Sequence, residues 1–522
     1  MHWSRWGDPD RVRPLPEALR GLLQKRFGTG DVSFTVPLGA VRLPDSDLPG
    51  GFLPALVDIV GAASVTTDAE ARVRHTGGKS TPDLIRLRSG DGSAAPDAIV
   101  TPGSHEQVHE IITLCSQHRV ALIPFGGGTS VVGGLRADRG RFEGVVALDL
   151  ARLTELISVD PISQTAQLGA GLLGPAAEAL LEPHGFMIGH YPQSFEYASI
   201  GGFAATRSSG QASAGYGRFD AMVVGLRVAT GIGTLTLGTA PASAAGPDLR
   251  ELILGSEGAF GVITSVTVRV RPLPEARVYA GWRFSSFEAG ASALRSLAQA
   301  GPMPTVLRLS DEAETAVGLS APGEVTTHNG CLLIVGHEGS AEQVATTAPA
   351  VAARLRALGG SISDDSAGEH WRAGRFQAPY LRDALLDEGL LVETVETATF
   401  WANLPRVYAA ARGTLAESLT APGAPALVLC HISHVYPTGA ALYFTVVARP
   451  TGDPLQCWAT AKAAVSTAIV TAGGTITHHH AIGRDHKPWL AADIGEVGIE
   501  ILRGVKARLD PAGILNPGVL IP

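Results

Sequence analysis

The chain has 522 residues, a formal net charge of −8 and an isoelectric point near 6.1. This length predicts two or three domains, and 45% hydrophobic with 17% charged residues excludes a disordered chain. The acidic balance argues against nucleic-acid binding. The four cysteines are scattered without a C-x-x-C pair, which disfavours a disulfide framework or a structural zinc site.

The two ends of the sequence carry no recognisable targeting signal. "MHWSRWGDPD" has the character of neither a signal peptide nor a transit peptide, and "GVLIP" is not a peroxisomal signal. No apolar run reaches the roughly 18 residues that a membrane span needs. We therefore expect a cytoplasmic protein, and peripheral membrane contact stays open.

The predicted elements, taken in chain order, indicate an α+β protein. Residues 1–95 combine Pro-rich turns with short helical patterns and predict an N-terminal extension without its own core. Short β-runs broken by glycine fill residues 96–275, and longer helices alternate with strands over residues 276–505. Residues 506–522 are typical of a helix end followed by turns.

One unit of the second region can be predicted in detail. "DAIVTPGSHEQVHEIITLCSQHRVALIPFGGG" predicts a strand, a helix, a second buried strand and a glycine loop. Ser104 and Gln107 form a candidate capping box at the start of the helix. Helical spacing predicts one buried stripe, made of Val108, Ile111, Ile112 and Cys115.

The glycine loop Gly126–Ser130 is the strongest chemical signal of this unit. Successive glycines let backbone N–H groups converge on an anion, and Thr129 and Ser130 add hydroxyl donors. A diphosphate suits such a loop, and a plain turn is the alternative. The loop is not a Walker A motif, because no lysine follows the glycines.

Further glycine motifs follow downstream. Gly169, Gly171 and Gly174 form a G-x-G-x-x-G that suggests a Rossmann site, but Pro175 opens the helix at once and no strand ending in an acid follows at the required distance. The segments "SIGGFAATRSSG" and "GSEGAFGVITSVTVRVRPLPE" offer backbone access and polar donors. Each is weak alone.

In this order the segments "PFGGGTSVVGGL", "SIGGFAATRSSG" and "GSEGAFGVITSVTVRVRPLPE" resemble the flavin-binding domain of the vanillyl-alcohol oxidase and para-cresol methylhydroxylase superfamily (FAD-binding PCMH-type). Within it, the chain is most similar to the alkyldihydroxyacetonephosphate synthases. The similarity covers about residues 80–522, including "PYLRDALL", "VETVETAT", "GAALYFTV" and "THHHAIGRDHKPWL".

The resemblance implies a two-subdomain FAD-binding domain over residues 96–275, an α+β cap over residues 276–505 and a tail that packs back on the FAD domain. It also implies a homodimer and non-covalent FAD, since the glycine loop ends in Thr-Ser and not in His. The implied FAD-binding residues are Pro124, Gly126, Gly127, Gly128, Thr129, Ser130, Ser199, Gly201, Gly202, Thr206, Arg207, Ser209, Gly210, Glu257, Gly261, Val262 and Ile263.

The resemblance further implies ether-lipid synthesis without net redox change. In that family the flavin N5 takes the C1 carbon of acyl-dihydroxyacetone phosphate as an adduct, and a fatty alcohol replaces the fatty acid. Arg382 would hold the phosphate, because a guanidinium forms a suitable fork. Tyr443 would be the hydroxyl acid/base, and His479, flanked by His478 and His480, the general base. The residues alone also allow an Arg382 paired with a nearby Asp and a Tyr443 that only packs.

Two departures from the family bear on the substrate and the source. His431 follows Cys430 where the synthases carry an arginine, so it would be a weaker, pH-dependent substrate contact. The eukaryotic targeting extension is missing and the composition is rich in Ala, Gly and Arg, from which we expect a bacterial relative.

Other functions on this scaffold stay open. One is a flavin oxidase or dehydrogenase of a 2-hydroxy acid such as D-lactate or glycolate. Those enzymes commonly carry an H-x-G-D-G-N-x-H segment, whereas this chain reads "HVYPTGAALYF". A flavin-dependent enzyme of secondary metabolism is a second alternative, and a non-catalytic flavoprotein a third.

The triple histidine in "TITHHHAI" is predicted to lie on an extended strand. Side chains alternate along a strand, so His478 and His480 would share one face and His479 would point the opposite way. Three such residues cannot all face one ion, and we expect no metal site. His479 is therefore predicted to be the working imidazole.

Overall fold

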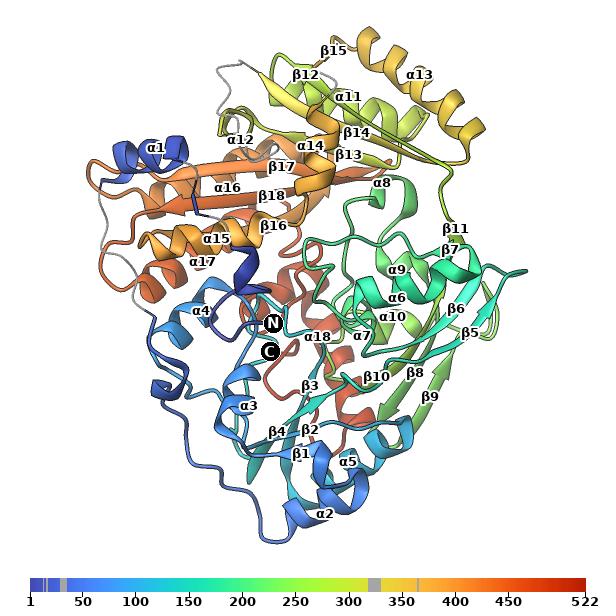
Figure 1. Ribbon diagram of the computed structural model, residues 1–522, viewed down its shortest axis with the longest axis vertical. Helices are drawn as coiled ribbons and strands as arrows, with labels where there is room; N and C mark the ends of the chain where they lie inside the picture. Colours follow the sequence, from blue (N-terminus) through green and yellow to red (C-terminus); the bar gives the residue numbers. More distant parts are fainter. Residues whose placement is uncertain (13, 16, 29–34, 318–329, 364–365) are drawn as a thin grey trace.

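The computed structural model describes residues 1–12, 14–15, 17–28, 35–317, 330–363 and 366–522. Its strands form three main sheets, with the two smaller sheets in the lower half of Figure 1 and the largest in the upper half. Helices and strands alternate throughout, which confirms the predicted α+β class. No helix among the described residues is long and apolar enough to cross a membrane.

The first sheet positions the glycine loop. Its strand order is β1 (Val65–Thr66), β2 (Ala98–Val100), β4 (Gly144–Asp149) and β3 (Val120–Phe125). The last three strands are parallel, and β3 leads directly into Gly126. The predicted strand–helix–strand unit is confirmed, with α5 (His105–His118) burying the four predicted apolar residues.

Only half of the predicted capping box forms at α5. Ser104 Oγ accepts a hydrogen bond from the Gln107 backbone N–H (3.2 Å), as predicted. The Gln107 side chain, however, accepts from the N–H of Gly103 (2.7 Å) instead of that of Ser104. The N-terminus of the helix is therefore fixed by both side chains, one residue out of the expected register.

The second sheet is antiparallel and excludes a Rossmann site. Its order is β5 (Leu156–Asp160), β6 (Thr165–Gly169), β10 (Val262–Arg269), β8 (Val223–Thr230) and β9 (Gly233–Leu237). Gly169 ends β6, which pairs antiparallel with both neighbours, whereas a Rossmann motif requires a parallel βαβ unit. A Cβ on Gly171 would collide with the Leu150 carbonyl, so close packing explains this glycine. A small β7 (Phe186–Met187) and β11 (Arg271–Pro272) pair lies beside this sheet.

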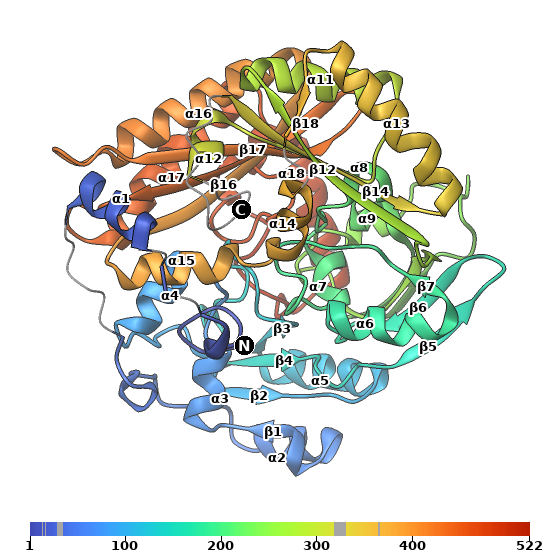
Figure 2. The same ribbon diagram turned by 45° about the horizontal axis from the view of Figure 1, so that its top comes forward.

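The third sheet forms the cap. Its order is β15 (Ser361–Ile362), β12 (Ala276–Phe284), β14 (Cys331–Gly339), β13 (Val306–Ser310), β17 (Leu427–Val435), β18 (Gly439–Ala448) and β16 (Leu391–Phe400). Figure 2 shows α11 (Phe287–Ala300), α13 (Ala341–Ala357), α16 (Leu404–Leu419) and α17 (Pro454–Thr471) on the outer side of this sheet. The opposite face of the sheet points toward the interior of the molecule.

The remaining helices connect these layers. They are α1 (Glu17–Phe27), α2 (Phe52–Val60), α3 (Ala69–Arg74), α4 (Thr81–Arg88), α6 (Gly174–Leu181), α7 (Ile200–Ala205), α8 (Ser213–Tyr216), α9 (Phe219–Met222), α10 (Arg250–Ile253), α12 (Glu312–Ala316), α14 (Ala367–Gly374), α15 (Ala378–Asp387) and α18 (Leu490–Leu509). Figure 1 shows both chain ends at the junction between the cap and the lower sheets.

The two terminal regions tie these parts together. Within residues 1–95, Phe52 and Leu56 join the core of the lower sheets, whereas Leu23 and Phe27 pack against the cap. At the other end, the Asn516 side chain donates to the carbonyls of Gly134 (3.1 Å) and Glu257 (2.6 Å), beside the glycine loop. The N-terminal region therefore packs against both halves of the molecule, and the C-terminal tail packs beside the glycine loop.

Candidate active site

A cavity of about 590 Å³ lies between the glycine loop and the inner face of the cap sheet. Its lower wall is made by the loops at 126–130, 198–211 and 257–263. Its upper wall is made by α15, the strands β16 to β18 and two of the three adjacent histidines. Segments that are far apart in the sequence therefore meet around one space.

The glycine loop has the geometry of an anion cradle. A Cβ on Gly126 would collide with the Ser199 hydroxyl, and a Cβ on Gly127 would collide with the Tyr197 carbonyl. Gly128 has φ of +71°, a left-handed conformation that favours glycine. Only glycines allow the loop to pack this closely, and the loop lines the cavity, so these residues fit the diphosphate of FAD.

Most of the other predicted FAD-binding residues line the same cavity. The loop itself is followed around the wall by Pro124, Ser199, Gly201, Gly202, Thr206, Ser209, Glu257, Gly261, Val262 and Ile263. Arg207 and Gly210 do not line the cavity that the described residues form. The Arg207 guanidinium instead pairs with Asp220 (3.2 Å) and Glu251, which ties its loop to α10 and not to a ligand.

A row of polar residues crosses the inner face of the cap sheet. His431 of β17 lies directly opposite Tyr443 of β18, and Tyr443 lies directly opposite Glu396 of β16. Residues that are paired across strands share a face, and the neighbours Cys430, Ile432, Leu442 and Phe444 point into the apolar core under the outer helices. Strand alternation thus presents this row to the interior.

Glu396 is fully buried and holds the triple-histidine loop. Its carboxylate accepts hydrogen bonds from the backbone N–H groups of His478 (2.7 Å), His479 (3.2 Å) and His480 (3.0 Å), and from the Thr477 hydroxyl. It also lies 3.5 Å from His479 Nδ1 and 3.9 Å from His480 Nδ1. One carboxylate therefore orients the backbone of the loop and contacts two of its imidazoles.

The predicted extended strand at the histidines is wrong. Residues 474–486 contain no helix or strand, and their N–H groups bond to Glu396 where a strand would bond to a neighbouring strand. His479 and His480 both reach Tyr443, with ring centroids 5.9 Å and 5.6 Å away, while His478 turns toward Tyr436. The predicted alternation, with His478 and His480 on one face, therefore does not hold.

Burial sets the protonation states of this group. It lowers the pKa of His479 against the opposing effect of Glu396, and it lowers the pKa of His480 to about 3. Burial raises the pKa of Tyr443 to about 12. For Glu396, burial favours the neutral acid, but the adjacent histidines outweigh it and hold its pKa well below the usual range. At neutral pH, a neutral imidazole thus stacks on a protonated phenol beside a carboxylate, which suits acid–base chemistry.

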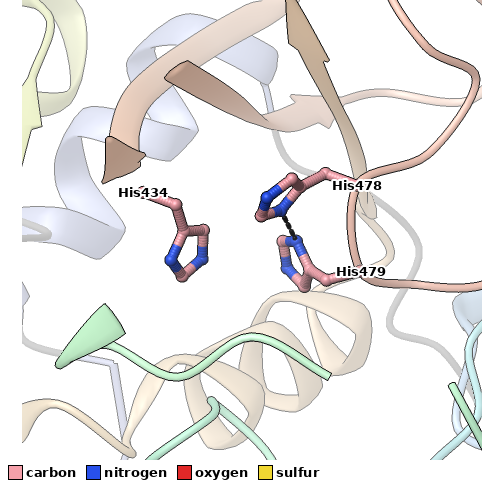
Figure 3. A group of neighbouring side chains, drawn as sticks. All are labelled: His434, His478 and His479. Carbon is pink, nitrogen blue, oxygen red and sulfur yellow. Dashed lines mark hydrogen bonds between the residues drawn. The ribbon is translucent and has the colours of Figure 1, made fainter. Parts of the chain in front are cut away.

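His434 joins the histidines because of a β-bulge. Pairing along β17 and β18 shifts between Ile432 and His434, so that His434 faces the cavity where simple alternation would bury it in the core. Figure 3 shows His434, His478 and His479 gathered together, with ligand atoms within 4.8 Å of one another. The sequence argument that the histidines could not share an ion rested on strand geometry and missed His434.

Four of the six ring nitrogens of this trio contact protein groups. His478 Nδ1 and His479 Nδ1 lie 3.0 Å apart, and His478 Nε2 lies 2.6 Å from the Tyr436 hydroxyl. His434 Nδ1 lies 3.0 Å from the hydroxyl of Ser209, on the FAD-side loop. Tyr436, His478 and His479 thus form one hydrogen-bonded group, and Ser209 and His434 form a second beside it.

The two predicted substrate-binding residues line the cavity in different settings. Arg382 of α15 contacts Asp383 (3.2 Å) and donates to the Lys79 carbonyl (2.6 Å). His431 is held at Nδ1 by Glu314 (3.0 Å), which also pairs with Arg308. Burial and the Arg308 charge lower the pKa of His431, so it is a neutral imidazole at physiological pH.

Several residues in or beside the cavity were not identified from the sequence. Glu396 and His434 belong to the histidine cluster, Arg308 to the His431 contact, and Arg375 and Trp6 to the cavity wall. Periodicity offered no signal for any of them. Only strand register, a bulge or long-range packing brings them to this space.

The arrangement can now be compared with known proteins. Residues 96–238 match a sequence profile described as FAD binding domain, and residues 273–520 match one described as FAD linked oxidases, C-terminal domain. Alkyldihydroxyacetonephosphate synthase of Dictyostelium discoideum is 35% identical, with 100% of this chain and 93% of the relative covered. The chain belongs to the alkyldihydroxyacetonephosphate synthase family.

Solved structures agree with this family assignment. A structure of alkyldihydroxyacetonephosphate synthase superposes with a TM-score of 0.86 at 30% identity, covering 99% of this chain and 98% of its own. p-Cresol methylhydroxylase superposes with a TM-score of 0.69 at 17% identity, covering 90% of this chain and 98% of its own, which shows a shared fold. The predicted synthase resemblance and the predicted two-part flavoprotein fold are thus confirmed.

Proposed function

We propose that this protein is an FAD-dependent alkyldihydroxyacetonephosphate synthase that replaces the acyl group of acyl-dihydroxyacetone phosphate with a fatty alcohol. The observation that carries the proposal is the stacked pair of Tyr443 and His479 over Glu396, on the cap wall that faces the FAD loop. The family match over the whole chain supplies the substrate class.

The exchange balances without an oxidant. The bond between C1 and the acyl oxygen breaks, the fatty acid leaves with the electron pair, and a bond between C1 and the alcohol oxygen forms. The alcohol loses one proton and the leaving carboxylate can take one up. Bound FAD would supply a nucleophilic ring nitrogen beside C1.

This chain's own residues can move those protons. Neutral His479 has a lone pair for the proton that leaves the alcohol, and its contact with the Glu396 carboxylate stabilises the imidazolium that results. Tyr443, whose high pKa keeps it protonated, can donate to the leaving oxygen. Arg382 of α15 lines the same cap-side wall of the cavity, where its guanidinium would contact the substrate phosphate.

The assay is direct. The purified, FAD-loaded protein is incubated without oxygen with acyl-dihydroxyacetone phosphate and a long-chain alcohol, and both products are measured by mass spectrometry. Ether lipid and free fatty acid should form in equal amounts. Reduction of a dye by D-lactate or glycolate, with no ether formed, would favour the 2-hydroxy-acid oxidase instead. That alternative has less support, because the synthase relatives match the chain over its full length.

The finer properties are part of the same proposal. We propose that FAD is held non-covalently, since Gly126–Ser130 contains no His, Cys or Tyr, and acid precipitation should release all of the flavin. We also propose a cytoplasmic homodimer with peripheral membrane contact. The exposed Ile494, Val497 and Ile501 on α18 support such contact, and light scattering and vesicle flotation would measure both properties. Bacterial origin stays a prediction from composition.

A further inference from the structure

Three arginines line the cavity, and two of them have acidic partners. Arg308 pairs with Glu314, and Arg382 pairs with Asp383. Arg375, just before α15, has no ion-pair partner among the described residues, and its Nη1 is buried without a hydrogen-bond acceptor. A buried guanidinium edge that lacks an acceptor is costly unless a ligand supplies one.

Arg375 is held in place from both ends. Its backbone carbonyl accepts hydrogen bonds from the amide groups of Gln193 (2.9 Å) and Gln211 (3.1 Å). Its guanidinium carbon lies 4.6 Å from the centre of the Tyr191 ring and 5.0 Å from that of Phe376. Stacking on ring faces leaves the in-plane N–H groups available, so the side chain is preorganised to donate hydrogen bonds.

Gln211 adds an acceptor to the same wall. With its amide nitrogen committed to the Arg375 carbonyl, its Oε1 is buried and also lacks a hydrogen-bond partner among the described residues. Both residues line the cavity. Arg375 is a cationic donor and Gln211 Oε1 a neutral acceptor, and both lack partners among the described residues. They suit a ligand oxygen that accepts a hydrogen bond from Arg375 and, when protonated, donates one to Gln211.

This pair lies next to the histidine cluster. Gln211 follows Ser209 by two residues, and the Ser209 hydroxyl lies 3.0 Å from His434 Nδ1. The His434 ring centroid is in turn 5.2 Å from that of His479. A ligand oxygen bound by Arg375 and Gln211 would therefore lie beside the residues that we place at the reaction centre.

The surroundings favour a carboxylate over a phosphate. Arg375 offers one free edge, and both neighbouring amide nitrogens are already used, whereas a phosphate dianion calls for several donors. Apolar side chains also line the cavity, among them Trp371, Leu381 and Leu385. A monoanionic head with a hydrocarbon chain matches one guanidinium on an apolar wall.

We infer that Arg375 and Gln211 form the subsite for the carboxyl group of the departing fatty acid, in which Arg375 donates to the carboxylate and Gln211 Oε1 accepts from the acid once it is protonated. The same two groups suit the entering alcohol, whose oxygen accepts from Arg375 while its hydroxyl donates to Gln211. This inference rests on the proposed function for the identity of its ligand. It assigns Arg382 and Arg375 to different ends of the substrate.

The test measures binding without turnover. FAD-loaded protein is titrated with decanoate and, separately, with inorganic phosphate, and the flavin absorbance spectrum reports each dissociation constant. Arg375→Met should weaken decanoate binding about 10-fold or more and leave phosphate binding unchanged. The decanoate dissociation constant of Arg375→Lys should lie between those of the parent protein and Arg375→Met, because lysine keeps the charge without the planar fork. Arg372→Met removes an arginine that is 45% exposed and should match the parent protein.

Gln211→Glu provides a second probe if Arg375→Met folds poorly. Its new carboxylate would pair with Arg375 and repel decanoate, so binding should again weaken. Unchanged decanoate affinity in both variants would overturn the subsite, as would a selective loss of phosphate binding or of FAD from Arg375→Met. Intact decanoate binding in a protein that forms no ether would instead contradict the proposed function and support the subsite.

Discussion

Replacing Glu396 with glutamine removes the negative charge beneath the triple-histidine loop and keeps the side-chain size. Glu396 accepts hydrogen bonds from the N–H groups of His478, His479 and His480 and from the Thr477 hydroxyl. In the variant, an amide NH₂ would face one or more of these donors. The substitution therefore tests whether the carboxylate organises the loop that carries the proposed base.

The size of the effect follows from these contacts. Hydrogen bonds to a charged group contribute about 1.5–3 kcal/mol each, compared with about 0.5–1.5 kcal/mol for neutral pairs. Losing the charge across four such bonds should lower the free energy of unfolding by about 3–5 kcal/mol, as expected when a buried charged network loses one partner. A misplaced general base should lower kcat/KM by about 100-fold or more.

The pH profile separates positioning from simple destabilisation. Glu396 opposes the effect of burial on the pKa of His479, so removing its charge should lower that pKa further. The base must be neutral to act, and activity rises as the pH increases through its pKa. The acidic limb of kcat/KM should consequently move to lower pH in Glu396→Gln, while its plateau falls.

The assay is ether formation across pH 5–9, together with urea unfolding of the same preparations. Glu388→Gln, which changes a partly exposed glutamate, should retain the parental profile. An unchanged rate in Glu396→Gln, or an acidic limb that moves to higher pH, would refute the role given to this carboxylate.

Three further predictions concern the same region. Tyr443→Phe should lower ether formation about 10²- to 10⁴-fold and keep the flavin absorbance, because only the proton donor is lost; full activity would exclude it as the acid. Burial lowers the pKa of His190 to about 3, so as the pH falls below 6.5 the unfolded state binds a proton first and stability is lost. This proton uptake lowers the free energy of unfolding by about 2 kcal/mol at pH 5. Urea unfolding at pH 7 and pH 5 should therefore show that His190→Gln loses about 2 kcal/mol less stability between the two pH values than the parent protein does. EDTA should leave activity unchanged, because both ring nitrogens of His478 already contact protein groups, so the trio does not offer three free ligand atoms; a loss that zinc restores would place a metal there.

Local patterns were enough to predict the FAD side of the cavity. The stripe of α5 and the strand β3 follow from helical and strand periodicity, and the chain leaves β3 directly into Gly126. Glycine spacing then indicated a close approach of the backbone, which the packing of Gly127 against Tyr197 explains. Such features depend on residues that are near in sequence, so the sequence alone contains them.

The cap side depends on contacts between distant segments. Glu396, His431 and Tyr443 form one row only because the three strands pair in one particular register. His434 faces the cavity because of a β-bulge that the local sequence does not predict. The histidine run was predicted as a strand because its composition suits one, yet the buried acceptor Glu396 binds its N–H groups and holds it as a loop.

Isotope tracing of the alcohol oxygen tests the central claim most directly. The FAD-loaded protein is incubated with acyl-dihydroxyacetone phosphate and a fatty alcohol labelled with ¹⁸O, and the masses of the products are measured by mass spectrometry. The proposed exchange breaks the bond between C1 and the acyl oxygen, so the ether lipid should contain the label and the released fatty acid should contain none. Label in a new fatty ester, or no labelled ether at all, would contradict the account.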